Sequence, residues 1–236
     1  MMNRQQANPR RLIANDEADS RLGSFLTVVS VFFVGLMFVA MSTDPVSIGV
    51  DKGEMPPNIV GDARIANSAW FDFDLHSKFN SSWDGNATTD RWILVQFMDT
   101  DCPYCWRDAE LLTEIDKQFG GVLTTVVVAT ELNIGGHSTS RAEIAAFQDK
   151  TDYQGCYGGD RNCADRPGDP HQGLNGNKFY YVEDLPGDSL KDWNLQGTPS
   201  CFLLQPNGLV AYNSMQDGGC DGIGSKLYEL FGGGAS

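Results

Sequence analysis

Two cysteines separated by two residues, Cys102 and Cys105, stand between a strand-like run and a helical pattern. The preceding run, residues 92–98 (WILVQFM), has the β-branched and aromatic content of a buried strand. After the motif, apolar residues recur at helical spacing as far as Phe119. The sequence therefore predicts a strand, a short turn and a helix, with the two cysteines at the start of the helix.

This position gives the two thiols different chemistry. Unpaired N–H groups and the helix dipole favour an anion at a helix N-terminus, so we expect Cys102 to be the attacking thiolate. Cys105 lies about one turn further along the same helix face, where it can close a disulfide with Cys102. It would resolve the mixed disulfide that Cys102 forms with a partner. The motif thus predicts a redox-active Cys102–Cys105 pair, with a static structural disulfide as the alternative.

Four further cysteines complete an even set of six. They lie in loops rich in Gly and Asp or beside a strand, which is typical of structural disulfides in an oxidising compartment. Four cysteines allow three pairings, and the sequence does not choose among them. A second redox pair acting as a relay is an alternative. The pairs that we favour are Cys156–Cys163 and Cys201–Cys220.

An uncharged run of twenty residues, 22–41, follows a polar leader at residues 1–21. At about 1.5 Å per residue the run spans roughly 30 Å, the thickness of a hydrocarbon core. We interpret it as an uncleaved transmembrane anchor, because the apolar region of a signal peptide is shorter and ends at a small-residue cleavage site. Basic residues are more frequent before the run than soon after it. We therefore expect residues 1–21 to be cytoplasmic and the rest extracytoplasmic.

Beyond the anchor, residues 42–69 contain scattered Pro, Gly and polar residues, which predict a flexible linker. Residues 70–236 alternate between strand and helix patterns, which predicts an α/β layered domain. A Gly- and Asp-rich excursion at about residues 151–178 interrupts this alternation, and a disulfide would stabilise it. The expected strands lie near 70–75, 92–98, 122–129, 179–182, 201–204 and 209–212, and the expected helices near 103–119, 141–150, 189–194 and 221–231.

Together these features resemble the thioredoxin superfamily, and within it the membrane-anchored TlpA/ResA-like thiol–disulfide oxidoreductases. Three segments occur in the family's order: the strand and C-x-x-C motif at 92–106, the Gly-Thr-Pro tripeptide at 197–199, and the hairpin 205–210 (QPNGLV) before a final amphipathic helix. The resemblance covers residues 70–231. It implies a thioredoxin-like fold, a central mixed sheet flanked by helices, which one N-terminal transmembrane helix precedes here.

The resemblance also implies roles for the residues around the cysteines. Pro199 should be a cis proline that faces the cysteines, and Thr198 should offer backbone groups to an extended substrate strand. The implied activity is thiol–disulfide exchange with client proteins and a redox partner protein, without a cofactor or a metal. We place the wall of the substrate site at Pro103, Tyr104, Trp106 and Gly197.

Three residues depart from the family pattern. Asp101 stands directly before the first cysteine, where Trp is common, and Asp99 is close by. Both carboxylates should disfavour ionisation of Cys102 and oppose the helix dipole. Gln96 occupies the position where thioredoxins have a buried Asp that assists proton transfer, and an amide cannot do so. The sequence therefore leaves open both the pKa of Cys102 and the identity of the proton acceptor.

The net charge of the chain argues against one class of binding partner. Residues 1–50 hold four Arg and four acidic residues, so the net charge of −14 belongs to the rest of the chain. Such an acidic surface argues against nucleic-acid binding. Two other functions stay open: a carrier that holds Cu(I) between the C-x-x-C thiolates, and a redox-inert thioredoxin-like interaction module. A zinc set would match no established spacing; its members would be Cys156, Cys163, His137 and His171.

Overall fold

The computed structural model describes residues 13–42, 46–86 and 90–232, and for residues 13–22 and 38–42 it describes the backbone alone. The chain divides into two units, residues 1–45 and 46–236.

The first unit contains helix α1 (Ile13–Ser42), and nearly all its described side chains, from 23 to 37, are exposed. Among the described residues, no helix is long and apolar enough to cross a membrane. The expected anchor at 22–41 extends past the described side chains at both ends. The anchor therefore stays a prediction.

A seven-stranded sheet forms the centre of the second unit. Its strands are β1 (Val60–Arg64), β2 (Phe71–Asp74), β3 (Trp92–Met98), β4 (Leu123–Thr130), β7 (Phe179–Asp184), β8 (Ser200–Leu204) and β9 (Val210–Asn213). They stand in the order β2-β1-β7-β4-β3-β8-β9. β4 runs parallel to β3 and β7, and every other neighbouring pair is antiparallel. The sheet is therefore mixed, as predicted.

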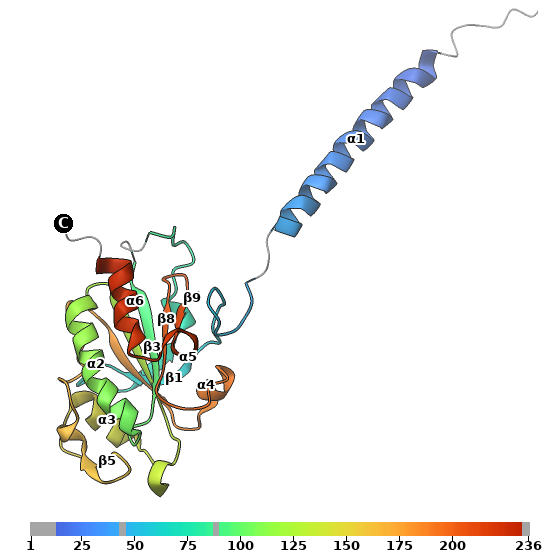
Figure 1. Cartoon of the computed structure of the whole chain (residues 1–236). Coiled ribbons are helices and arrows are strands. Elements are labelled where there is room, and N and C mark those ends of the chain that lie inside the picture. The colour runs from blue at the N-terminus through green and yellow to red at the C-terminus, as the bar shows by residue number, and fades with distance from the viewer. Residues whose placement is uncertain (1–12, 43–45, 87–89, 233–236) are drawn as a thin grey trace, which may run out of the picture. The chain divides into compact units, whose positions relative to one another are not determined.

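Helices cover both faces of this sheet (Figure 1). One apolar cluster joins the sheet to three helices, and a second joins the opposite face to one helix and to residues 46–59. The first three helices are α2 (Pro103–Phe119), α3 (Arg141–Asp149) and α6 (Gly222–Phe231). The helix on the opposite face is α4 (Asp188–Asp192), and a single turn, α5 (Ser214–Asp217), follows β9. This confirms the predicted arrangement of a mixed sheet flanked by helices.

The central strand β3 shows why the layers form. Successive side chains of a strand point to opposite faces, and all seven of its residues are buried. Leu94 belongs to the cluster under α2, whereas Val95 belongs to the cluster on the other face. A strand that is apolar in both directions must be covered on both sides, which explains the continuous apolar run in the sequence.

The prediction of a flexible linker at 42–69 is wrong for its described part, residues 46–69. β1 lies within this segment and pairs with both β2 and β7. Ile59 and Ala63 are fully buried, and the Arg64 guanidinium donates to the Asp149 carboxylate at 2.6 Å. Gly53 lies in a turn before the strand, whereas Gly61 lies within β1 itself. A composition typical of linkers thus belongs to an integral part of the sheet.

The excursion at about 151–178 is also integral to the fold. It contains a small hairpin of β5 (Gln154–Cys156) and β6 (Arg161–Asn162), and the Cys156–Cys163 disulfide closes it. Arg166 is fully buried, and its guanidinium donates to the carbonyl oxygens of Phe147 and Gln148. A buried cation needs such partners, so the excursion is anchored to the end of α3. The other disulfide, Cys201–Cys220, ties β8 to the segment before α6. Both pairs are those that we favoured.

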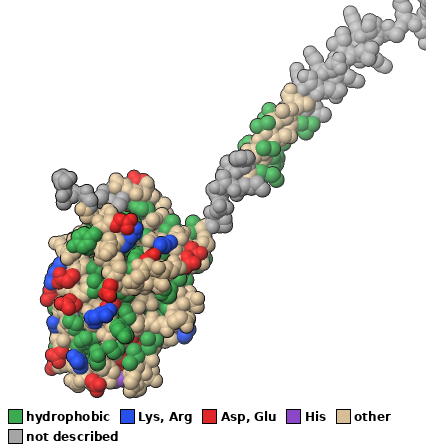
Figure 2. Space-filling model, in the orientation of Figure 1, with side chains coloured by type: hydrophobic (Ala, Val, Ile, Leu, Met, Phe, Trp, Pro, Cys, Tyr) green, Lys and Arg blue, Asp and Glu red, His purple; other side chains and the backbone are tan. Residues whose placement is uncertain are grey.

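Charged side chains of both signs are interspersed on the face shown in Figure 2. Several cations lie against carboxylates, for example Arg141 with Asp62 at 2.6 Å and Lys226 with Glu229 at 2.8 Å. Exposed pairs of this kind contribute only about 0–1 kcal/mol each. The stability of the domain therefore depends on the apolar clusters rather than on its surface charge.

The corrected position of residues 46–69 can be tested by substitution. Ile59→Ala should lower the free energy of unfolding by about 2–5 kcal/mol, because it removes a fully buried side chain. Val60→Ala should change it by less than about 0.5 kcal/mol, since Val60 is 68% exposed. Urea denaturation of both variants measures the difference. Equal, negligible effects would instead indicate a linker.

Candidate active site

The sheet brings two distant segments to one edge. β3 ends at Met98, and a short turn, residues 99–101, leads to the C-x-x-C motif; the antiparallel neighbour of β3, β8, begins at Ser200. Phe97 pairs with Ser200 in this ladder, so the residues before β8 lie beside the turn that leaves β3. The peptide bond between Thr198 and Pro199 is cis, as the resemblance implied. The register of β3 and β8 thus positions both halves of the site.

The cysteines occupy the start of α2. Cys102 is the N-cap residue, and its sulfur accepts a hydrogen bond from the backbone N–H of Cys105 at 3.3 Å. Its thiol donates to the carbonyl oxygen of Thr198 at 3.5 Å. Neither thiol is in a disulfide, and both residues are buried, with exposed fractions of 3% and 2%. The two thiols are therefore almost equally buried, and they differ in their partners.

These partners set the ionisation of the pair. The hydrogen bond from the Cys105 side chain is the largest influence on Cys102 and, with nearby backbone N–H groups, lowers the pKa of Cys102 from 9.0 to about 6. Burial opposes this shift. For Cys105 burial is the largest influence, and it raises the pKa well above the usual value. The arrangement favours one thiolate, on Cys102, and one thiol, on Cys105.

The two neighbouring carboxylates, which we expected to disfavour ionisation of Cys102, are engaged in hydrogen bonds of their own. Both accept hydrogen bonds from other parts of the protein. Asp99 accepts from the backbone N–H groups of Asp101 and Leu132 at 2.8 and 2.7 Å. Asp101 accepts from Gly158 N–H at 2.8 Å and lies 2.8 Å from Nδ1 of His137. Their negative charges are thus partly compensated away from the sulfur.

The four residues assigned to the substrate wall have different surroundings. Tyr104, within the motif, is 63% exposed, and the Arg107 guanidinium lies 5.7 Å from its ring centre. Pro103 is exposed at the first position of α2, and nothing lies within 4 Å of the position that a Cβ on Gly197 would take. These three can border an approaching chain.

Trp106 is the exception. Only 7% of it is exposed, and its ring makes edge contacts with Phe147 and Tyr157 at centroid distances of 6.1 and 5.5 Å. Its assignment to the substrate wall is therefore corrected: it joins α2 to α3 and to the excursion. The position directly after Cys105 lies on the side of α2 that faces the core, so the Trp106 ring is buried there.

A buried polar cluster behind the motif was missed by the sequence analysis. The Thr100 hydroxyl donates to Glu143 Oε1 at 2.5 Å and lies 3.0 Å from the hydroxyl of Thr139. Burial raises the pKa of Glu143 to about 7. The pattern Ser140-x-x-Glu143 predicts a capping box, but only half of one forms: Ser140 Oγ accepts from Glu143 N–H, while the carboxylate turns inward. The sequence pattern that marks the start of α3 therefore gave no indication that the Glu143 carboxylate is buried.

Gln96 and the excursion complete the surroundings. Gln96 is buried on the sheet face that carries α2, and its Nε2 has no hydrogen-bond partner in the described part of the chain. From the excursion, Tyr157 N–H donates to the Thr100 carbonyl oxygen at 3.1 Å, close to the Gly158 contact with Asp101. The excursion therefore supports the turn that precedes Cys102.

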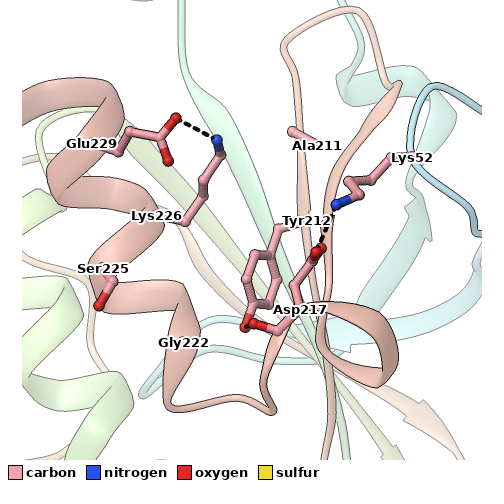
Figure 3. A pocket seen from close by; sticks show the side chains of 8 residues that line it. All are labelled: Lys52, Ala211, Tyr212, Asp217, Gly222, Ser225, Lys226 and Glu229. Carbon is pink, nitrogen blue, oxygen red and sulfur yellow. Dashed lines mark hydrogen bonds and ion pairs between the residues drawn. The ribbon is translucent and has the colours of Figure 1, made fainter.

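Two other candidate sites gain no role. Cys156 and Cys163 are bonded to each other, and the two ring nitrogens of His171 lie within hydrogen-bond distance of Tyr181 OH and the Ala109 carbonyl oxygen, so the zinc set does not assemble. A pocket of about 370 Å³ lies between β9 and α6, lined by none of the motif residues (Figure 3). Its two lysines are paired with carboxylates, Lys52 with Asp217 and Lys226 with Glu229, and we assign it no function.

The pKa of Cys102 provides a direct test of the site. The alkylation rate of the reduced protein in EDTA should rise with a midpoint near pH 6. About nine-tenths of Cys102 should then be thiolate at pH 7. Cys105→Ala should move the midpoint upward, because the largest stabilising hydrogen bond is lost, whereas Cys105→Ser should move it less. A midpoint near 9 in the unsubstituted protein would contradict this account.

No family model matches the chain, and comparison with curated protein sequences gives no match. The thioredoxin domain of a thiol-disulfide oxidoreductase from Bacteroides vulgatus is similar in structure, with a TM-score of 0.49 and 15% identity over 77% of this chain and 99% of that one. A thiol:disulfide interchange protein from Bacteroides sp. has a TM-score of 0.46 and 17% identity over 81% and 93%. A 2-Cys peroxiredoxin from Plasmodium vivax has 0.43 and 13% over 69% and 83%. Likenesses of this degree do not assign an activity, which must be argued from the site.

Proposed function

We propose that the protein is a thiol–disulfide oxidoreductase that acts on protein disulfides through Cys102 and Cys105. The main support is geometric: the Cys102 sulfur caps α2, accepts from Cys105 N–H and faces the carbonyl of Thr198, next to cis-Pro199. A purely structural pair would not need a sulfur held between helix donors and a separate loop. The lowered pKa of Cys102 adds to this support.

The chemistry has two exchange steps. The Cys102 thiolate attacks one sulfur of a client disulfide, a new S–S bond forms to Cys102, and the other client sulfur leaves as a thiolate. Cys105 then loses its proton and attacks Cys102, which releases the second client thiol and closes the Cys102–Cys105 disulfide. Two electrons pass from the dithiol to the client. The reverse sequence oxidises a client dithiol.

The residues around Cys102 suggest how a client is held. Tyr104 offers an exposed aromatic ring, and the open space at Gly197 lets a chain approach the loop before β8. An extended client segment that pairs with backbone groups near Thr198 would lie across the Cys102 sulfur. Such pairing depends on the backbone of the client more than on its side chains. It therefore suits an enzyme that acts on several different client proteins.

A trapping experiment tests the exchange. Cys105→Ser should accumulate mixed disulfides between Cys102 and client proteins, because the resolving thiol is absent while a hydroxyl donor to Cys102 remains. The measurement is a shift in mobility on non-reducing gels that dithiothreitol reverses. Cys102→Ser is the matched control and should trap no client. Failure of folded Cys105→Ser to form any adduct with a model disulfide substrate would overturn the proposal.

We also propose that residues 22–41 anchor the enzyme in a membrane, with residues 1–21 in the cytoplasm and the catalytic domain outside it. Three features support this: the uncharged twenty-residue run, the greater number of basic residues before it, and the two structural disulfides, which persist best in an oxidising compartment.

Fractionation tests the anchor. The full chain should stay with membranes after alkaline carbonate extraction, because a spanning helix is not removed with peripheral proteins. A chain that lacks residues 13–42 should be released while keeping its disulfide reductase activity. Recovery of the full chain in the carbonate supernatant would contradict the anchor without affecting the proposed chemistry.

A further inference from the structure

Three ionisable side chains converge beside the motif but take no part in the thiol exchange. Asp101 follows β3, His137 follows a short turn after β4, and Glu143 comes from α3. Their possible ligand atoms all lie within 4.8 Å of one another. Asp101 and Glu143 are buried, with exposed fractions of 1% and 0%, whereas the His137 side chain is 29% exposed. The cluster therefore has two buried carboxylates and one side open to solvent.

Each carboxylate is fixed through one oxygen. Gly158 N–H donates to Asp101 Oδ1 at 2.8 Å, and the Thr100 hydroxyl donates to Glu143 Oε1 at 2.5 Å. Asp101 Oδ2 then faces His137 Nδ1 at 2.8 Å. Within the described chain, Glu143 Oε2 has no hydrogen-bond partner, although it is buried. Outer contacts that fix one oxygen and leave the other available are typical of metal-binding carboxylates.

The unpartnered oxygen needs an explanation. A buried polar atom without a partner costs about 1–3 kcal/mol, more when it is charged. A third carboxylate, Asp99, lies near His137, but its oxygens are occupied by Asp101 N–H, Leu132 N–H and the Thr139 hydroxyl. One imidazole thus stands among three acids. A cation at the centre would satisfy Glu143 Oε2 and offset the excess negative charge.

We propose that Asp101, His137 and Glu143 form a binding site for one divalent transition-metal ion, with Zn²⁺ the best match. One imidazole nitrogen and two carboxylate oxygens are ligands that zinc accepts, and water from the exposed side of His137 would complete four-coordination. At bond lengths of about 2.0–2.1 Å, ligand atoms of a tetrahedral zinc lie roughly 3.3 Å apart. The 2.8 Å between Asp101 Oδ2 and His137 Nδ1 requires only a small separation to reach this spacing.

The imidazole of His137 indicates which class of metal ion would bind. Mg²⁺ and Ca²⁺ prefer oxygen ligands throughout, whereas imidazole nitrogen suits Zn²⁺ and its neighbours in the first transition row. This site shares no cysteine with the thiol exchange. The proposal therefore stands or falls independently of the proposed function.

The test uses the full chain with Cys102→Ser and Cys105→Ser, so that no free thiol can bind metal. Isothermal titration with ZnCl₂ should give one ion per chain, and Mg²⁺ should not bind in its place. Adding Glu143→Gln or His137→Ala should weaken zinc binding by at least about tenfold. His76→Ala removes a histidine outside the cluster and is the matched control, which should bind zinc as the parent does.

Folding of each variant is checked by circular dichroism. Glu143→Gln keeps an oxygen that can accept from Thr100, so it is the variant least exposed to a folding defect. If His137→Ala does not fold, Glu143→Gln decides alone, with the visible spectrum of tetrahedral Co²⁺ as a second measurement. The proposal is overturned if the parent shows no saturable zinc binding, if Mg²⁺ binds as strongly, or if Glu143→Gln binds zinc as tightly as the parent. Without saturable metal binding, the cluster is an Asp101–His137 ion pair beside a buried acid.

Discussion

The candidate site depends on the antiparallel pairing of β3 with β8. This register places Ser200 opposite Phe97, so the chain entering β8 lies beside the turn that leaves β3. Because β3 is buried on both faces, a shift of one residue would exchange its two sets of apolar side chains between the two clusters. The packing of the sheet therefore fixes the contact between Cys102 and Thr198, although these residues are far apart in the sequence.

Short-range hydrogen bonds are the main cause of the lowered pKa of Cys102. Formal charge alone predicts a suppressed thiolate, since Asp99 and Asp101 precede the cysteine. Both carboxylates, however, are bonded to donors from other segments, and the sulfur accepts from groups on α2. The hydrogen bonds from the side chain and the backbone N–H of Cys105 lower the pKa of Cys102 despite its burial. The acidic neighbours therefore serve the architecture of the turn.

Patterns that are local in sequence predicted a large part of this molecule. The run 92–98, the C-x-x-C motif and the tripeptide at 197–199 each carry their own signal, and together they predicted the mixed sheet and the position of the cysteines. Two features could not be obtained this way. β1 is recognised as a strand only by its partners β2 and β7. Glu143 matches a helix cap, and only the tertiary contact with Thr100 shows that its carboxylate is buried.

The excursion at about 151–178 connects these observations. Its backbone holds Thr100 and Asp101 through Tyr157 and Gly158, and its ring at Tyr157 packs on Trp106 of α2. Its disulfide closes the small hairpin, and its buried Arg166 ties it to the carbonyl oxygens of Phe147 and Gln148 on α3. Gln96 on β3 carries no charge, and the polar side chains around the motif come from the turn after β3, from residues 137–139 and from α3. The backbone donors of Tyr157 and Gly158 thus help to position the turn that carries Asp101 from outside the central strand.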